Sequence, residues 1–181
     1  MLILASASPR RHELLLAARI EHVVRPAHIS ETREEGEPPH AYVQRIATNK
    51  AQAVSAAASE IVLGADTIVC VEDTVLGKPG VAQEAARMLR LLSGREHTVL
   101  TGIALRQGNR LVTGFEETRV WFDELSEQEI AEYIETGEAC DKAGAYAIQG
   151  YASRFVRRIE GCYHNVVGLP VSLVYRHLKS L

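Results

Sequence analysis

Apolar residues recur along the chain at two spacings. Where they alternate or form a continuous run, they predict strands, and where they return every three or four positions, they predict helices. Strands are predicted over residues 2–5, 21–25, 61–71, 96–107, 110–123 and 155–159. Helices are predicted over residues 9–19, 39–58, 81–92, 126–137 and from 170 to the end. Gly108-Asn109 and Glu72-Asp73-Thr74 are hairpin turn signals. This succession of strands and helices is typical of an α/β fold.

The run from Ile61 to Val71 is apolar and rich in β-branched residues, with one carboxylate, Asp66, near its middle. It is too short to span a membrane as a helix and has the character of a buried central strand. An ionised aspartate is costly in such a strand unless it is paired, binds a metal or faces a cleft. The alternative is that Asp66 begins a turn or caps a loop.

A predicted first strand leads through small residues into Ser8-Pro9-Arg10-Arg11, where a helix should begin. Ser8 suits the N-cap position and Pro9 the first turn. Two arginines carry the wrong charge for a helix N-terminus, which favours anions. A bound phosphate would reverse this mismatch, since free N–H groups at a helix start bind phosphate. The alternative is a pair of solvated arginines.

Two lysines are candidates for contacts with an anion. Lys50 falls on the apolar stripe of the predicted helix 39–58, four residues after Ile46, so it either reaches the solvent edge or meets an anion in a cleft. Lys78 lies in the tight loop Gly77-Lys78-Pro79, which can hold an ammonium group against a phosphate or be an ordinary loop. The acidic segment 30–39 is either simply solvated or a mobile flap.

Small residues surround Tyr146 and Gln149 in the segment 141–150. They allow the backbone to approach a flat ligand closely, and the Gln149 amide offers both the donor and the acceptor needed to read the edge of a nucleobase. The alternative is a glycine-rich connector with an exposed glutamine.

Composition narrows the classes of function. The 181 residues are 46% hydrophobic and 24% charged with a formal net charge of −3, which argues against a general nucleic-acid binder. The three cysteines show no CxxC spacing, which indicates reduced thiols and a cytoplasmic protein. No apolar run is long enough for a membrane helix. Histidine spacing predicts no metal site, so a bound metal should be a hard cation on carboxylates, such as Mg²⁺.

Taken together, a series of short motifs resembles the Maf family of nucleoside triphosphate pyrophosphatases. They occur in family order: 4–11, 49–51, 63–67, 77–79, 93–94, 101–102, 141–146, 148–150 and 167–170. Each motif alone is weak, but the ordered set covers nearly the whole chain. The resemblance implies one Maf-like domain over 1–181, with an elongated, mixed, twisted sheet flanked by helices and two lobes around a cleft.

The resemblance also implies hydrolysis of a nucleoside triphosphate to the monophosphate and pyrophosphate, with a divalent cation such as Mg²⁺ or Mn²⁺. Asp66 matches the family's proton acceptor. Other matches to positions of the active cleft are Ser8, Arg10, Arg11, Glu31, Lys50 and Lys78. Asp66 and Glu31 are the expected metal ligands.

Three positions, Arg10, Thr67 and Gln149, resemble the branch of the family that acts on dTTP and UTP. Two positions depart from the usual pattern: Ala147 stands where glycine is usual, and Cys162 where serine is frequent. A methyl group at Ala147 would narrow a base pocket.

Two other functions compete with this one. A nucleotide-sensing regulator of septum formation would bind the nucleotide with little catalysis, and a phosphatase would release orthophosphate. The resemblance also allows a homodimer. A nucleic-acid or membrane partner is not expected.

Overall fold

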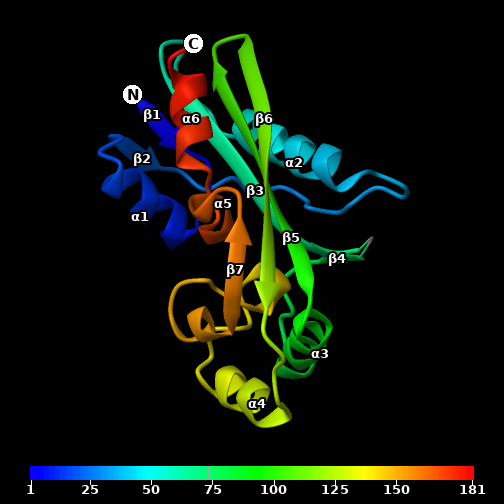
Figure 1. Ribbon diagram of the computed structural model, residues 1–181. Helices are drawn as coiled ribbons and strands as arrows, with labels where there is room; N and C mark the ends of the chain where they lie inside the picture. The colour runs from blue at the N-terminus through cyan, green and yellow to red at the C-terminus, as the bar shows by residue number, and fades with distance from the viewer. Residues whose placement is uncertain (73) are drawn as a thin grey trace. The chain divides into compact units, whose positions relative to one another are not determined.

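A computed structural model describes residues 1–72 and 74–181, so part of the predicted turn 72–74 lies outside the described residues (Figure 1). The strands are β1 (Leu2–Leu4), β2 (His22–Val24), β3 (Ile61–Val71), β4 (Thr74–Leu76), β5 (Glu96–Gln107), β6 (Arg110–Phe122) and β7 (Val156–Glu160). The α-helices are α1 (Pro9–Ala17), α2 (Pro39–Ala53), α3 (Ala82–Leu92), α4 (Glu127–Glu135), α5 (Tyr163–Val167) and α6 (Val171–Leu178). Two 3₁₀ helices, η1 (Ala143–Ala145) and η2 (Tyr151–Phe155), lie between α4 and β7.

The strands form a seven-stranded sheet in the order β2-β1-β3-β5-β6-β7, with β4 paired to β3. β1 pairs in parallel with both β2 and β3, and the β3–β4 and β6–β7 pairs are antiparallel. The predicted mixed sheet flanked by helices is therefore confirmed.

The chain divides into two compact units. The first consists of Met1–Thr67, Thr101–Glu116 and Gly168–Leu181, and the second of Ile68–Leu100 and Glu117–Val167. Three strands, β3, β5 and β6, are shared, because each begins in one unit and ends in the other.

In the first unit, helices cover both faces of the sheet because successive strand side chains point to opposite sides. One core joins α1 and α6 to the face that carries Leu4, Leu63 and Ile103. The other core joins α2 to the face that carries Ile3 and Val62. Because α1 and α6 pack against one face and α2 against the other, both the segment 8–11 and Lys50, which are candidate site residues, lie beside β3.

Two glycines allow α2 to approach the sheet very closely. A Cβ atom built on Gly64 of β3 would lie 2.0 Å from the carbonyl oxygen of Ala47, and one on Gly102 of β5 would lie 2.3 Å from that of Val43. These distances are far shorter than any contact a real Cβ makes, so only glycine fits. The close approach sets the height of α2, and with it of Lys50, above β3.

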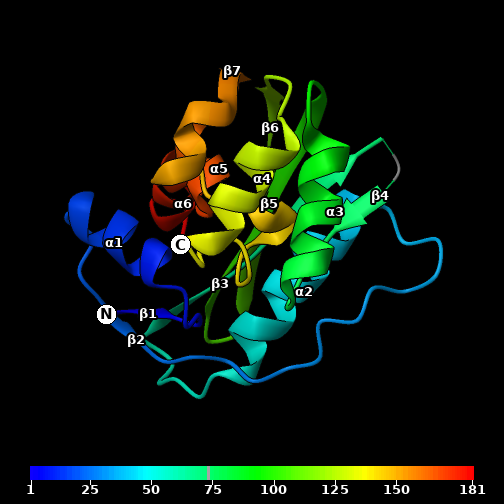
Figure 2. The same cartoon turned by 90° about the horizontal axis from the view of Figure 1, so that it is seen from below.

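The second unit has an aromatic core around Phe122, Tyr133 and Phe155, all of which are buried. Its helices α3 and α4 lie side by side (Figure 2) and are linked by an ion pair between Arg90 and Glu127. At the start of α4, Ser126 and Glu129 form the capping box that their spacing predicts.

Most predicted elements are present, and β3 has the bounds predicted for it. Two kinds of difference have physical causes. The helix predicted to run to residue 58 ends at Ala53, because Val54 adopts an extended conformation. Helix α5 and the 3₁₀ helices were not predicted, since three to five residues are too few to show a helical period. In the described part of the chain, no helix is long and apolar enough to cross a membrane.

We predict that Gly64→Ala lowers the free energy of unfolding by about 3 kcal/mol or more, because the added methyl group collides with the backbone of α2. Urea denaturation measures this difference. Gly77→Ala is the matched control, since a Cβ there meets nothing within 4 Å. A loss of stability for Gly64→Ala no larger than that for Gly77→Ala would contradict the close packing of α2.

Candidate active site

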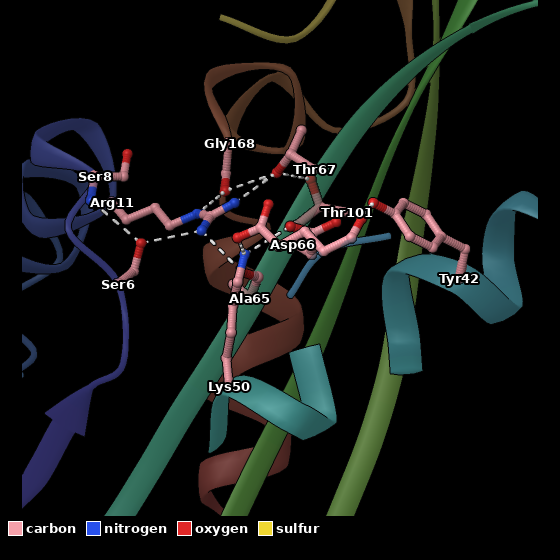
Figure 3. Close-up of polar contacts among 11 residues, drawn as sticks. Ser6, Ser8, Arg11, Tyr42, Lys50, Ala65, Asp66, Thr67, Thr101 and Gly168 are labelled. Carbon is pink, nitrogen blue, oxygen red and sulfur yellow. Dashed lines mark hydrogen bonds and ion pairs between the residues drawn. The ribbon is translucent and has the colours of Figure 1, made fainter. Parts of the chain in front are cut away.

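Asp66 is a buried carboxylate on β3, with 6% of its surface exposed. The Nζ atom of Lys50 lies 2.7 Å from its Oδ1 and 3.4 Å from the carbonyl oxygen of Ala65 (Figure 3). Lys50 is itself buried, so its ammonium group is directed into the protein and does not reach the solvent edge. Of the two alternatives for Asp66, the structure supports the paired carboxylate rather than a turn or cap.

Glu31 joins this pair from the acidic loop. Its Oε1 lies 2.8 Å from the Nζ of Lys50, and half of its side chain is exposed. The hydroxyl of Tyr42 on α2 donates a hydrogen bond of 2.7 Å to the backbone oxygen of Glu31. Burial, with the nearby charges of Asp66 and Glu31, raises the pKa of Tyr42 to about 12, so its hydroxyl keeps the proton that it donates.

The surroundings of Asp66 change its basicity. Burial raises the pKa of its carboxyl group, while the charges of Lys50 and then Arg11 act in the opposite direction, and the rise prevails. The ionised form is therefore a stronger base than a solvent-exposed aspartate would be.

Arg11 is also buried, although it lies in the first turn of α1, which contains no acidic residue. Its guanidinium group leaves the helix and donates hydrogen bonds to four acceptors, which are the carbonyl oxygens of Ala65 and Gly168 and the hydroxyls of Ser6 and Thr67. The sequence suggested either a phosphate contact or a solvated side chain for Arg11. The structure shows neither, because the side chain is buried and its hydrogen bonds go to acceptors within the protein.

Arg10 and Ser8, which belong to the same motif as Arg11, are more accessible than Arg11. Arg10 is half-buried. Ser8 occupies the N-cap position with an extended backbone, but its side chain makes no capping hydrogen bond, and its N–H donates to the Ser6 hydroxyl at 3.2 Å. The predicted N-cap is therefore right in position.

The hydroxyl of Thr67 lies at the centre of the same network. It contacts the hydroxyl of Thr101 at 2.9 Å and donates to the carbonyl oxygen of Gly168 at 3.2 Å, while Arg11 donates to it at 3.0 Å. With its single proton directed at Gly168, Thr67 accepts from both Arg11 and Thr101. The side chain beside Asp66 is thus held on three sides.

Comparison with known proteins identifies the family. A family model described as Maf-like protein matches residues 1–181. The chain is 54% identical over 179 residues to a protein named dTTP/UTP pyrophosphatase from Koribacter versatilis, covering 98% of this chain and 93% of the relative. It is 51% identical over 181 residues to a protein of the same name from a Geobacillus species, covering 99% and 97%. The chain belongs to the Maf family.

One solved structure, a nucleoside-triphosphatase or dITP/XTP pyrophosphatase from Mycobacterium abscessus, matches 99% of this chain and 97% of its own. The sequence identity is 14% and the TM-score 0.43, a likeness too slight to carry a conclusion.

Two of the residues that match the Maf family, Lys78 and Gln149, belong to the second unit and are both exposed. The loop that carries Lys78 is tied to the segment 141–150 by a hydrogen bond from Gly144 N–H to the carbonyl oxygen of Gly77. The structure thus brings the backbone of these two predicted segments together within the second unit.

Hydrogen bonds to buried side chains hold the segment 141–150 in place. Tyr146 is buried and its hydroxyl lies 2.8 Å from Nε2 of His97, whose pKa is lowered by burial to about 3. The backbone of Ala147, one of the two departures from the usual Maf pattern, donates to the hydroxyl of Tyr133 at 3.3 Å. Cys162, the other departure, has its N–H and carbonyl oxygen bonded to Thr118.

The donor set of the first unit fits a hard cation. Asp66 and Glu31 each place a carboxylate oxygen within 3 Å of the same nitrogen. Mg²⁺ commonly takes only one or two protein carboxylates, with substrate phosphates and water as its other ligands. Over residues 1–72 and 74–181, no group of three or more His, Cys, Asp and Glu is arranged to hold a metal ion, so phosphates would be needed to complete the coordination.

Sequence reasoning assigned no role to several residues of this network, namely Ser6, Tyr42, Thr101 and Gly168. Thr101 and Gly168 lie in motifs shared with the Maf family. Thr101 also interrupts an apolar run in the predicted strand 96–107, which was an available signal that its hydroxyl has a partner. Tyr42 offered no signal, because an aromatic residue on an apolar helix face is usually part of a core.

We predict that Lys50→Met lowers the free energy of unfolding by about 3 kcal/mol at neutral pH, because it leaves the buried Asp66 carboxylate without its closest cation. The difference from the wild type should shrink as the pH falls through the pKa of Asp66, since a protonated carboxyl group no longer needs the ammonium partner. Denaturation at several pH values measures both effects.

The control is Lys179→Met, which removes an exposed lysine near the C-terminus. Its effect should be small and independent of the protonation of Asp66. A Lys50→Met deficit that stayed constant with pH would mean that the lysine stabilises the protein through packing alone.

Proposed function

We propose that this protein hydrolyses dTTP and UTP to the nucleoside monophosphate and pyrophosphate. Relatives about half identical to this chain over nearly its full length bear the name dTTP/UTP pyrophosphatase. The observation that carries the reaction itself is the buried Asp66–Lys50 pair, a carboxylate made more basic by burial and held ionised by an ammonium group 2.7 Å away.

In this reaction Asp66 takes a proton from water. The water oxygen forms a bond to the α-phosphorus as the bond from that phosphorus to the bridging oxygen breaks, and pyrophosphate leaves with the electron pair. Lys50 keeps the carboxylate in place before the proton is transferred, because its Nζ donates a hydrogen bond to Oδ1 of Asp66.

A triphosphate carries about four negative charges, so binding it requires converging cations. Within the proposal, Lys50, Lys78 and the half-buried Arg10 contact the phosphates. Arg10, Thr67 and Gln149 select the pyrimidine base, a role that rests on the family resemblance. The engaged hydroxyl of Thr67 supports a contribution through shape rather than through a hydrogen bond to the base.

A divalent cation, Mg²⁺ or Mn²⁺, completes the proposed site, with Asp66 and Glu31 as its protein ligands. When bound, it neutralises phosphate charge and makes the α-phosphorus more electrophilic. The Tyr42 hydroxyl supports this assignment of Glu31, because it anchors the backbone of an otherwise exposed loop residue.

We also place this activity in the cytoplasm, where nucleoside triphosphates are found and where the three free cysteines would stay reduced. The alternative, a nucleotide sensor for septum formation with little catalysis, is not favoured, because the relatives are named as enzymes. Homodimer formation stays a prediction.

The direct test is to incubate the purified protein and Mg²⁺ with dTTP, UTP, CTP and modified pyrimidine triphosphates and to identify the products. We expect pyrophosphate and monophosphate from dTTP and UTP. Release of orthophosphate would instead indicate a phosphatase, and tight nucleotide binding without turnover would indicate a sensor.

We predict that Asp66→Asn abolishes turnover while nucleotide binding largely survives. An amide of the same shape cannot accept the proton from water but keeps the volume of the side chain. Steady-state rates and calorimetric titration with dTTP separate these two effects. Retention of full activity would remove Asp66 from the role of base.

We further predict that chelation by EDTA stops hydrolysis of dTTP and that added Mg²⁺ restores it. Glu31→Gln should raise the Mg²⁺ concentration needed for half-maximal rate, because it removes one of two carboxylate ligands. Glu35→Gln, an exposed change in the same acidic loop, is the matched control. Full activity in EDTA would show that the reaction needs no cation.

A further inference from the structure

The side chain of Arg11 has little capacity left for a ligand. An arginine has five N–H donors. Among the described residues, Nε donates to the oxygen of Gly168 at 2.8 Å, Nη1 donates to Ser6 and Ala65 at 3.1 and 2.8 Å, and Nη2 donates to Thr67 at 3.0 Å. Four of the five donors are thus engaged inside the first unit.

The engaged donors exclude the usual mode of phosphate binding by arginine. A bidentate contact needs two N–H groups on one edge of the guanidinium plane. The guanidinium group has two such edges, one formed by Nε and Nη2 and the other by Nη1 and Nη2. Because the hydrogen of Nε and both hydrogens of Nη1 are in use, each edge has at most one N–H left, on Nη2. Only 8% of the residue is exposed, which further limits contact with a substrate.

Two of the four bonds go to the residues on either side of Asp66. Arg11 holds the residue before Asp66 through the carbonyl oxygen of Ala65 and the residue after it through the hydroxyl of Thr67 (Figure 3). Thr67 is held in addition by Thr101 and Gly168. A single side chain on α1 therefore fixes both flanks of the carboxylate on β3.

We propose that Arg11 is a positioning residue for Asp66 and not a ligand of the triphosphate. Its guanidinium group clamps the Ala65–Thr67 segment so that the carboxylate points at the attacking water. This inference rests on the proposed function for the role of Asp66 as base, and it replaces the substrate contact that the family resemblance implies for Arg11.

The test compares Arg11→Lys, Arg11→Met and Arg10→Met by steady-state kinetics with dTTP. Misplacement of a catalytic group can lower a rate by on the order of 100-fold, so we expect both Arg11 variants to lose on the order of 10- to 100-fold in kcat while KM changes by less than about threefold. Arg10→Met, at the adjacent and more accessible arginine, should mainly raise KM.

A large rise in KM with kcat preserved, reversed by lysine, would show that Arg11 binds substrate and would overturn the proposal.

Thr101 offers a milder variant in case the Arg11 variants do not fold. It is fully buried and its hydroxyl contacts that of Thr67 at 2.9 Å, so it can influence the site without touching the substrate. Thr101→Val, which removes the hydroxyl, should lower kcat without raising KM, and Thr101→Ser, which keeps it, should restore kcat. Wild-type kinetics in Thr101→Val would overturn the network as a positioning device.

A second measurement does not depend on catalysis. Calorimetric titration with dTTP compares Arg11→Met and Arg10→Met, each combined with Asp66→Asn. The affinity should be nearly unchanged by Arg11→Met and lowered by Arg10→Met. A loss of affinity in Arg11→Met as large as that in Arg10→Met contradicts the inference even if the wild-type protein hydrolyses dTTP, whereas an inactive wild type with the expected affinities contradicts only the proposed function.

Discussion

The central constraint on this structure is the cost of keeping an ionised carboxylate inside a β-sheet. Asp66 lies in a strand whose neighbours are almost all buried and apolar. An isolated charge there would be neutralised by taking up a proton. Lys50 meets it directly and Arg11 adds a second positive charge nearby, so the charge is compensated inside the protein. Two cations come from two different helices, and this requirement explains why both helices must be placed accurately.

Packing supplies that accuracy. On one face of the first unit, Gly64 and Gly102 let the backbone of α2 rest on the sheet, so that Lys50 reaches Asp66 with an extended side chain. On the other face, Leu15 of α1 is fully buried in the core that contains Leu4 and Leu63. Arg11 lies one turn before Leu15, and the same packing therefore carries its guanidinium group to β3. The apolar cores thus determine the geometry of the polar cluster.

The sequence predicted the elements better than it predicted the contacts. The bounds of β3 follow from its unbroken β-branched run, and the capping box of α4 follows from the spacing of Ser126 and Glu129. The direction of the Arg11 side chain could not be predicted in this way. Its acceptors lie between 5 and 157 residues away along the chain, and periodicity carries no information about such distant partners. Lys50 was more accessible to prediction, because a lysine on an apolar stripe left only two alternatives, the solvent edge or an anion in a cleft.

Within the proposed function, the hydrogen bonds of Thr67 link the choice of base to the orientation of the Asp66 carboxylate. Thr67 is one of the three predicted specificity residues, and its hydroxyl binds the same guanidinium group that holds Ala65 on the other side of Asp66. A substitution at Thr67 that admits another base therefore also removes one of the two contacts that orient the carboxylate. In that proposal, selectivity and catalysis do not vary independently at this strand, because one buried arginine contacts both residues that flank Asp66. A change of substrate preference is more easily accommodated at Gln149, which is exposed, belongs to the second unit and lies outside this network.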